Sequence, residues 1–290
     1  MSDINFEKKI KILGEIVREV ESTLSFTILE IGAVPLEGAA EPFHQLLDIF
    51  PESQILAFEL DETLCAELNQ KSKPGITYYP VALGRTEERR TFYETNHPMC
   101  CSLYKPNEEL ISLYNNMEVA MLKSVSSIET CSIDYFTQEN DIESVDFIKI
   151  DIQGAELDAF QGADNTLKEV LAIVSEVEFI PHYIDQPLFG DVCSFLAEKE
   201  IMFHKFLGMA GRTLKPIIMN KSPNFPSQHM WSDAVFIKSI FKMPELPSNK
   251  LLKMGILTFL YGSPDVAFQC FKYYDEKNGT SIHQGFMSGF

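Results

Sequence analysis

Basic residues are scarce in this 290-residue chain, which has 24 Lys and Arg against 42 Asp and Glu. The formal net charge of −18 makes the surface repel the phosphates of nucleic acids and of anionic membranes. We therefore expect neither nucleic acid nor a membrane among the partners. No apolar run reaches the ~18 residues that a membrane span needs, and charges interrupt the N-terminal segment where a signal peptide needs an apolar core. These absences favour a soluble cytoplasmic protein.

Cysteine and histidine lack the spacings of a disulfide framework or a metal site. The six cysteines form no CxxC pair and are spread irregularly along the chain. The six histidines form no HxH, HxxxH or HExxH pattern. We therefore expect free thiols in a reducing compartment and no bound metal.

What the chain does contain is an alternation of short apolar runs with helix-like stretches. The apolar runs have the length and β-branched content of buried strands, and Gly, Pro and acidic residues bound them. Such alternation predicts a parallel sheet with helices on both faces. The expected strands are 26–33, 54–60, 76–83, 145–152 and 171–179, with a final strand pair before residue 241, and the expected helices are 41–50, 61–71, 154–170 and 188–200.

Three further segments complete the expected domain organisation. An apolar stripe at helical spacing predicts a leading helix in 1–25, before a main domain over 26–245. Within that domain, 84–144 breaks the rhythm and indicates an edge strand plus an excursion that carries a lid or pocket. Beyond a Pro-rich connector, 246–290 predicts a helical hairpin with Ser263 as N-cap. A single hairpin cannot form a solenoid, so we expect it to pack on the main domain, on a partner or on a second copy of the chain.

In such a sheet, functional groups lie in loops at the carboxyl ends of strands. The first junction reads ILEIGAVPLEGAAEPF and places Gly32 and Gly38 where a nucleotide-like cofactor needs close approach of the backbone. A glycine turn common to any α/β protein explains the same residues. Glu59 follows the second strand, where an acidic side chain can bind both hydroxyls of a ribose, and a solvated loop acid is the alternative. Asp61 is expected to be the N-cap of the next helix.

The third motif, VDFIKIDIQGAELDAFQGA at 145–163, closely resembles the signature of FkbM-type methyltransferases. The resemblance extends over about 26–240, because LEIGA, AFE, VALG and CSL follow in the order of that family's other motifs. It implies a class I, Rossmann-like methyltransferase with a doubly wound, mostly parallel seven-stranded sheet. It further implies S-adenosylmethionine as cofactor and a hydroxyl oxygen as the most common methyl acceptor.

The resemblance also assigns cofactor contacts by position. Glu30, Gly32 and Ala33 hold the methionine end, and Glu59 binds the ribose. The VPLEG loop departs from the family's compact loop, which leaves the contacts of Gly38 open. The remaining implied contacts are Ala82 and Leu83 beside the adenine, Ser102 near the cofactor, and Asp151 facing the methyl group.

A hydroxyl acceptor must lose a proton, and three side chains on strand-end loops are candidate bases: Asp151, then His182, then Glu178. Each has an alternative role. Asp151 can be the N-cap of the following helix or a cofactor contact, His182 can be exposed, and one of Glu176 and Glu178 can face solvent or an ion pair.

Two other functions compete with an oxygen methyltransferase acting on a sugar or natural product. One is a non-catalytic protein of the same fold that has lost cofactor binding and whose helical tail mediates an interaction. Acids retained at both strand ends, Glu59 and Asp151, argue against that loss of cofactor binding. The other is a nicotinamide-dependent oxidoreductase, which the missing GxGxxG fingerprint disfavours.

Overall fold

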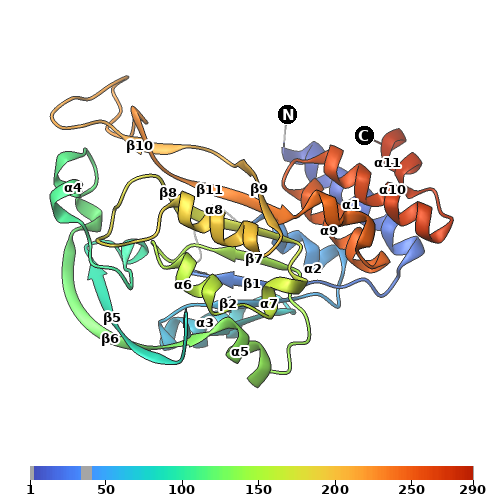
Figure 1. The fold of residues 1–290 in the computed structure, drawn as a ribbon, viewed down its shortest axis with the longest axis horizontal. Helices are drawn as coiled ribbons and strands as arrows, with labels where there is room; N and C mark the ends of the chain where they lie inside the picture. Colours follow the sequence, from blue (N-terminus) through green and yellow to red (C-terminus); the bar gives the residue numbers. More distant parts are fainter. Residues whose placement is uncertain (1–2, 34–40, 290) are drawn as a thin grey trace.

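A mostly parallel sheet forms the centre of the computed structural model, which describes residues 3–33 and 41–289. Within this part of the chain the sheet has eight strands in the order β10-β11-β8-β7-β1-β2-β3, and β9 also pairs with β11 (Figure 1). Five neighbouring strands of this sheet, β8, β7, β1, β2 and β3, run parallel to one another. Strand β11 is antiparallel to β8, β9 and β10. Their bounds are β1 Thr27–Ile31, β2 Gln54–Phe58, β3 Ile76–Tyr79, β7 Phe147–Ile150, β8 Ala172–Glu178, β9 Ile201–Phe206, β10 Ala210–Arg212 and β11 Gln228–Lys238.

The parallel α/β core is as predicted, but the sheet has eight strands rather than the seven expected. The difference arises at β11, which is 11 residues long. One edge of β11 pairs with β8. Along its other edge, the first residues of β11 pair with β10 and the last residues pair with β9.

The prediction of a single strand over 76–83 is wrong. β3 ends at Tyr79, and Ala82–Gly84 forms a separate strand, β4, in a second sheet. Pro80 lies between them and has no N–H for a strand ladder, so the chain leaves the first sheet there. The second sheet has the order β4-β6-β5, with β5 Glu88–Thr95 and β6 Leu122–Ser132. The region predicted as an edge strand with an excursion therefore builds most of a sheet of its own.

Alternate residues of the central strands fill two hydrophobic clusters, one on each face of the sheet. On β7, for example, Phe147 belongs to one cluster and Ile148 to the other. The first face is covered by α1 Asp3–Val20, η1 Pro42–His44, α2 Gln45–Ile49, α9 Ser248–Leu260, α10 Pro264–Asn278 and α11 Ile282–Gly289. The second face is covered by α5 Ile133–Glu139, α6 Glu156–Gln161, α7 Thr166–Glu169 and α8 Phe189–Glu198, while α3 Glu62–Lys71 packs against β3.

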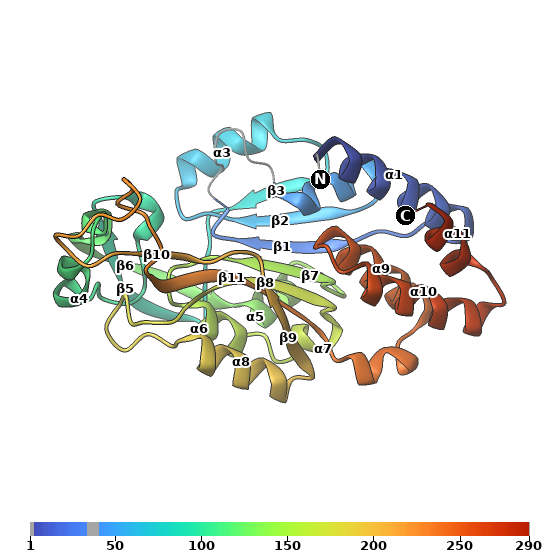
Figure 2. The same ribbon diagram turned by 90° about the horizontal axis from the view of Figure 1, so that it is seen from above.

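Helices from both ends of the chain meet on the first face. Helix α1 contacts α9 and α11, and these helices lie at the opposite end of the molecule from the second sheet and α4 Glu108–Leu113 (Figure 2). The described tail has three helices instead of the hairpin of two that the sequence predicts, because α11 follows Gly279. Among the described residues, no helix has the length and apolar character needed to cross a membrane.

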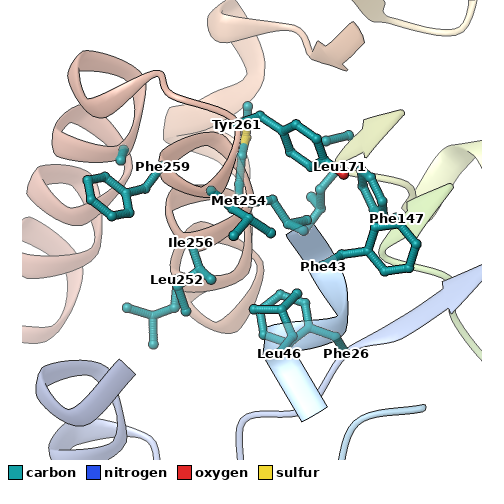
Figure 3. Packing of buried hydrophobic residues seen from close by; sticks show 14 of the residues in the cluster. Phe26, Phe43, Leu46, Phe147, Leu171, Leu252, Met254, Ile256, Phe259 and Tyr261 are labelled. Atoms are coloured by element: carbon teal, nitrogen blue, oxygen red, sulfur yellow. The ribbon is translucent and has the colours of Figure 1, made fainter. Parts of the chain in front are cut away.

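The tail is part of the core of the sheet. Tyr261 stacks on Phe147 of β7 with ring centroids 5.5 Å apart, and Phe43 of η1 lies 5.4 Å from the same ring. Met254, Ile256 and neighbouring side chains of α9 enter this cluster from the tail (Figure 3). The helical extension therefore packs on the main sheet.

A buried carboxylate anchors the tail to the sheet. Asp146 precedes β7 with 1% of its side chain exposed. It accepts hydrogen bonds from Lys250 Nζ at 3.0 Å, Lys253 Nζ at 2.7 Å and the backbone N–H of Thr27 at 3.1 Å. One side chain thus joins the starts of β1 and β7 to α9.

Replacing Asp146 by Ala leaves two largely buried lysines without their shared partner. Breaking a buried pair from one side costs about 3–5 kcal/mol, so we expect Asp146→Ala to lose that much free energy of unfolding in urea titrations. Asp48→Ala is the matched control, because it removes an exposed pair with Lys73 worth ~0–1 kcal/mol. Equal losses in the two variants would show that Asp146 is no anchor.

Candidate functional site

A cavity of about 1090 Å³ lies at the carboxyl ends of the parallel strands. The loops after β1, β2 and β7 form its floor, and the segment 98–103 with residues of the second sheet forms a wall. Residues predicted from the sequence make up a large part of its lining: Glu30, Gly32, Ala33, Glu59, Ala82, Leu83, Ser102 and Asp151. The predicted Gly38 lies outside the described residues, as does the rest of the VPLEG loop.

The end of β1 fits tightly against the end of β7. Gly32 has φ +83°, and a Cβ there would lie 2.0 Å from the carbonyl oxygen of Asp151. No side chain fits this position, which brings the two strand-end loops together. The N–H groups of Gly32 and Ala33 both donate to the carbonyl of Phe58, and the Glu30 carboxylate contacts His44 Nε2 at 3.0 Å.

Glu59 lies directly after β2 at the cavity surface. Its Oε1 accepts hydrogen bonds from the N–H groups of Leu60 at 2.8 Å and Asp61 at 3.1 Å. These bonds orient the carboxylate and leave Oε2 available to a ligand. Asp61 is the N-cap of α3, as predicted, and accepts from the N–H groups of Thr63 and Leu64.

Ala82 and Leu83 are buried on β4, which pairs with β6, and they face the cavity together with Phe58 and Ile152. Ser102 has 1% of its surface exposed. Its hydroxyl donates to the carbonyl of Gln153 at 2.6 Å and accepts from the N–H of Tyr104. Ser102 therefore ties the wall of the cavity to the loop after β7.

Asp151 is the one of the three candidate bases that lines the cavity. Its Oδ1 accepts a hydrogen bond from Gln153 Nε2 at 2.9 Å, and Gln153 Oε1 in turn accepts from Tyr183 Oη at 3.0 Å. Asp151 does not cap the following helix, because the N-cap of α6 is Ala155.

Glu178 and His182 are buried, with 2% and 7% of their surfaces exposed, and neither belongs to the cavity lining. His182 packs edge-on against Trp231 at 5.5 Å. Burial, with the nearby Arg212 charge, lowers the pKa of His182 to about 4. Tyr183 and Gln186 are also buried, and the Gln186 side chain accepts a hydrogen bond from the backbone N–H of Tyr183.

Carboxyl groups behind Asp151 resist ionisation. Burial raises the pKa of Glu156 to about 7, although the N–H groups of Ile152 and Gly154 donate to its carboxylate. Burial followed by the charge of Asp151 raises the pKa of Glu176 well above its usual value. Burial followed by the charges of Glu156 and Asp151 does the same for Glu178. The local negative charge is therefore smaller than the number of acids suggests.

Sequence reasoning missed several charged or titratable residues of the lining, among them Glu41, His44, Lys149 and Asp233. Lys149 interrupts the apolar strand FIKI, and Asp233 lies in the final strand SDAVFIK. A lysine in the middle of a buried strand requires an acidic partner, and this signal was present in the sequence. Which acid is the partner depends on the pairing of β11 with β8, which the sequence does not specify. Within 3–33 and 41–289, no cluster of His, Cys, Asp and Glu is arranged to hold a metal ion.

Comparison with known proteins places this cavity in a family context. The model of the methyltransferase FkbM domain matches residues 36–201, more than half of the chain. The 2-O-methyltransferase NoeI of Sinorhizobium fredii (strain NBRC 101917 / NGR234) is 24% identical over 208 residues, which covers 64% of this chain and 80% of that protein. The matched domain includes Glu59, Ser102 and Asp151, whereas Glu30 and Gly32 precede it and Asp233 follows it.

The low pKa of His182 predicts a loss of stability in acid. The unfolded state binds a proton near pH 6.5 and the folded state only near pH 4, so stability falls as the pH drops through this window. Between pH 7 and pH 5 we expect the wild type to lose about 2 kcal/mol relative to His182→Phe, which cannot take the proton. Urea unfolding followed by the fluorescence of the single tryptophan, Trp231, measures the difference. A difference between the two proteins that stays constant over this range would contradict the assignment.

Proposed function

This chain belongs to the methyltransferases of the FkbM family, and we propose that it transfers the methyl group of S-adenosylmethionine to a hydroxyl oxygen of a small neutral molecule, such as a sugar or other natural product. One cavity that joins the ends of β1, β2 and β7 supports this proposal most directly. Its volume of about 1090 Å³ is at the upper limit of the ~300–1,000 Å³ common for ligand pockets, which leaves room for a nucleoside cofactor and an acceptor together.

The lining residues fit the parts of that cofactor. The backbone at Gly32 carries no side chain and can approach the methionine end, beside Glu30. The oriented carboxylate of Glu59 has a free oxygen for ribose hydroxyls, while Leu83 and Ile152 offer apolar surface to an adenine. When bound, S-adenosylmethionine supplies a methyl carbon that is already activated by its positive sulfur.

Oxygen as the acceptor atom is supported by two observations. The NoeI relative is named a 2-O-methyltransferase. Asp151 supplies a carboxylate at the end of β7, next to the Gly32 turn, where a hydroxyl proton can be accepted. The hydrogen bond from Gln153 orients this carboxylate. In the transfer, the bond from acceptor oxygen to methyl carbon forms, the methyl–sulfur bond breaks with its electron pair left on sulfur, and the hydroxyl proton passes to Asp151.

The cofactor can be tested before any acceptor is known. Calorimetric titration with S-adenosylhomocysteine should show saturable one-to-one binding, and NAD in the same buffer should show none. Folded protein that binds neither compound would favour the alternative of a non-catalytic scaffold.

Glu59→Gln keeps an oxygen for the two loop amides but removes the charge that receives ribose hydroxyls. We expect its affinity for S-adenosylhomocysteine to fall at least ~10-fold, the usual cost of losing charged hydrogen bonds. Glu67→Gln is the control, since Glu67 is exposed on α3 and pairs only weakly with Lys71 at 3.5 Å. Unchanged affinity in Glu59→Gln would remove the ribose assignment.

Asp151→Asn keeps the shape of the side chain but cannot accept the proton. We expect its rate of methyl transfer to a hydroxylated acceptor to fall about 100- to 10,000-fold, with affinity for the neutral S-adenosylhomocysteine within a few-fold of wild type. Initial rates with methyl-labelled S-adenosylmethionine and a panel of methyl glycosides measure the effect. A rate close to wild type would move the base role to another group.

A further inference from the structure

Lys149 is a buried cation that none of the assigned roles explains. It has 8% of its surface exposed, yet it lines the cavity from the middle of β7. Its Nζ donates a hydrogen bond to Asp233 Oδ1 at 2.8 Å. Phe147, Ile148 and Ile150, the other residues of this strand, are all fully buried and apolar. A charge in such a strand is costly unless it has a partner, so a purely structural role would be served better by an apolar residue.

The strand order gives Lys149 its place in the cavity. Lys149 pairs in register with Glu30 of β1, so the two side chains share a face of the sheet. Asp233 lies on β11, which is two strands away from β7 on the side opposite to β1 and β2. The groups on the cavity floor therefore follow the order of the strands. Glu59, assigned to the ribose, follows β2, the next position is the loop after β1, Lys149 and Asp151 belong to β7 and its end, and Asp233 lies on β11. The cofactor assignment uses the first part of this floor, and Lys149 with Asp233 occupies the part beyond it.

The surroundings keep Lys149 protonated. Burial alone would lower the pKa of its ammonium group, but the carboxylates of Asp151, Asp233 and Glu41 outweigh burial and raise it. A permanent ammonium group cannot serve as a base and acts only as a donor. It has three N–H groups, and Asp233 is the one hydrogen-bond acceptor it has in the described part of the chain.

We propose that Lys149 is a further catalytic residue, whose ammonium group binds the acceptor hydroxyl oxygen beside the transferred methyl group while Asp233 holds the ammonium in place. The inference rests on the proposed function. An oxygen bound to this ammonium group loses its proton more readily to the adjacent Asp151. The three carboxylates around Lys149 also select against acceptors that carry carboxylate or phosphate near the reacting hydroxyl, which favours a neutral polyol such as a sugar ring.

The experiment compares S-adenosylmethionine, whose sulfur is positive, with S-adenosylhomocysteine, whose sulfur is neutral. The ratio of their dissociation constants reports the charge at the methyl end, because all other contacts are shared. Removing a cation close to that end in Lys149→Met should strengthen binding of the sulfonium compound relative to the neutral one by about tenfold. Lys149→Arg keeps the charge and should leave the ratio within about twofold of wild type.

Lys238→Met is the matched control. Lys238 is equally buried, with 8% of its surface exposed, but its Nζ donates to the carbonyl of Lys168, outside the cavity. Loss of this lysine should change stability without changing the ratio. A structural role for Lys149 would shift both affinities equally, so an unchanged ratio in Lys149→Met overturns the proposal while the methyltransferase function stands. Wild-type protein that binds neither compound is the separate failure of that function.

Catalysis gives the second readout. With a methyl glycoside that accepts the methyl group, Lys149→Met should lower kcat at least about 100-fold while it still binds S-adenosylmethionine, and Lys149→Arg should recover part of the rate. An undiminished kcat in Lys149→Met would overturn the catalytic role.

Discussion

The close contact between the ends of β1 and β7 is the constraint on which the site depends. Gly32 has a positive φ and no room for a side chain because the carbonyl of Asp151 occupies the space beside it. The N–H of Asp151 donates to the carbonyl of Ile31 at 3.0 Å, which extends the parallel ladder to this point. The loop proposed to approach the cofactor and the candidate base Asp151 are thereby held together by the backbone alone. Residues that are held by strands keep their relative positions more precisely than residues that are held by loops.

The electrostatics of the cavity floor follow from burial as much as from the number of charged groups. Four acids, Asp151, Glu156, Glu176 and Glu178, lie within electrostatic reach of one another, and three of them have pKa values raised by burial. Lys149 and Asp233 add an ion pair on the same floor, in which Lys149 is buried and Asp233 is partly exposed. Burial therefore favours the neutral form of the three glutamates behind Asp151.

Much of the fold could be read from periodicity, because strands buried on both faces leave unmistakable apolar runs. The break at Pro80 was not anticipated, since local pattern joined β3 and β4 into one run, and only the path of the chain assigns β4 to the second sheet. Within the site, Glu30, Gly32, Glu59 and Asp151 lie together because the ends of parallel strands must meet. Glu178 ends β8 and His182 follows that strand, but their side chains are buried outside the cavity, which the sequence did not reveal. Asp233 could not be assigned because its partnership with Lys149 depends on the position of β11 in the sheet.

The anchoring of the tail has a consequence for how the chain is made. Phe147 lies in the middle of the sequence, yet one side of it is covered by Tyr261 of the tail. Asp146 pairs with two lysines of α9, and α1 packs against α9 and α11, which follow it much later in the chain. The part of this face that α9, α10 and α11 cover therefore stays exposed until these helices have been synthesised. Until then, this apolar surface of the sheet is open to chaperones and to aggregation.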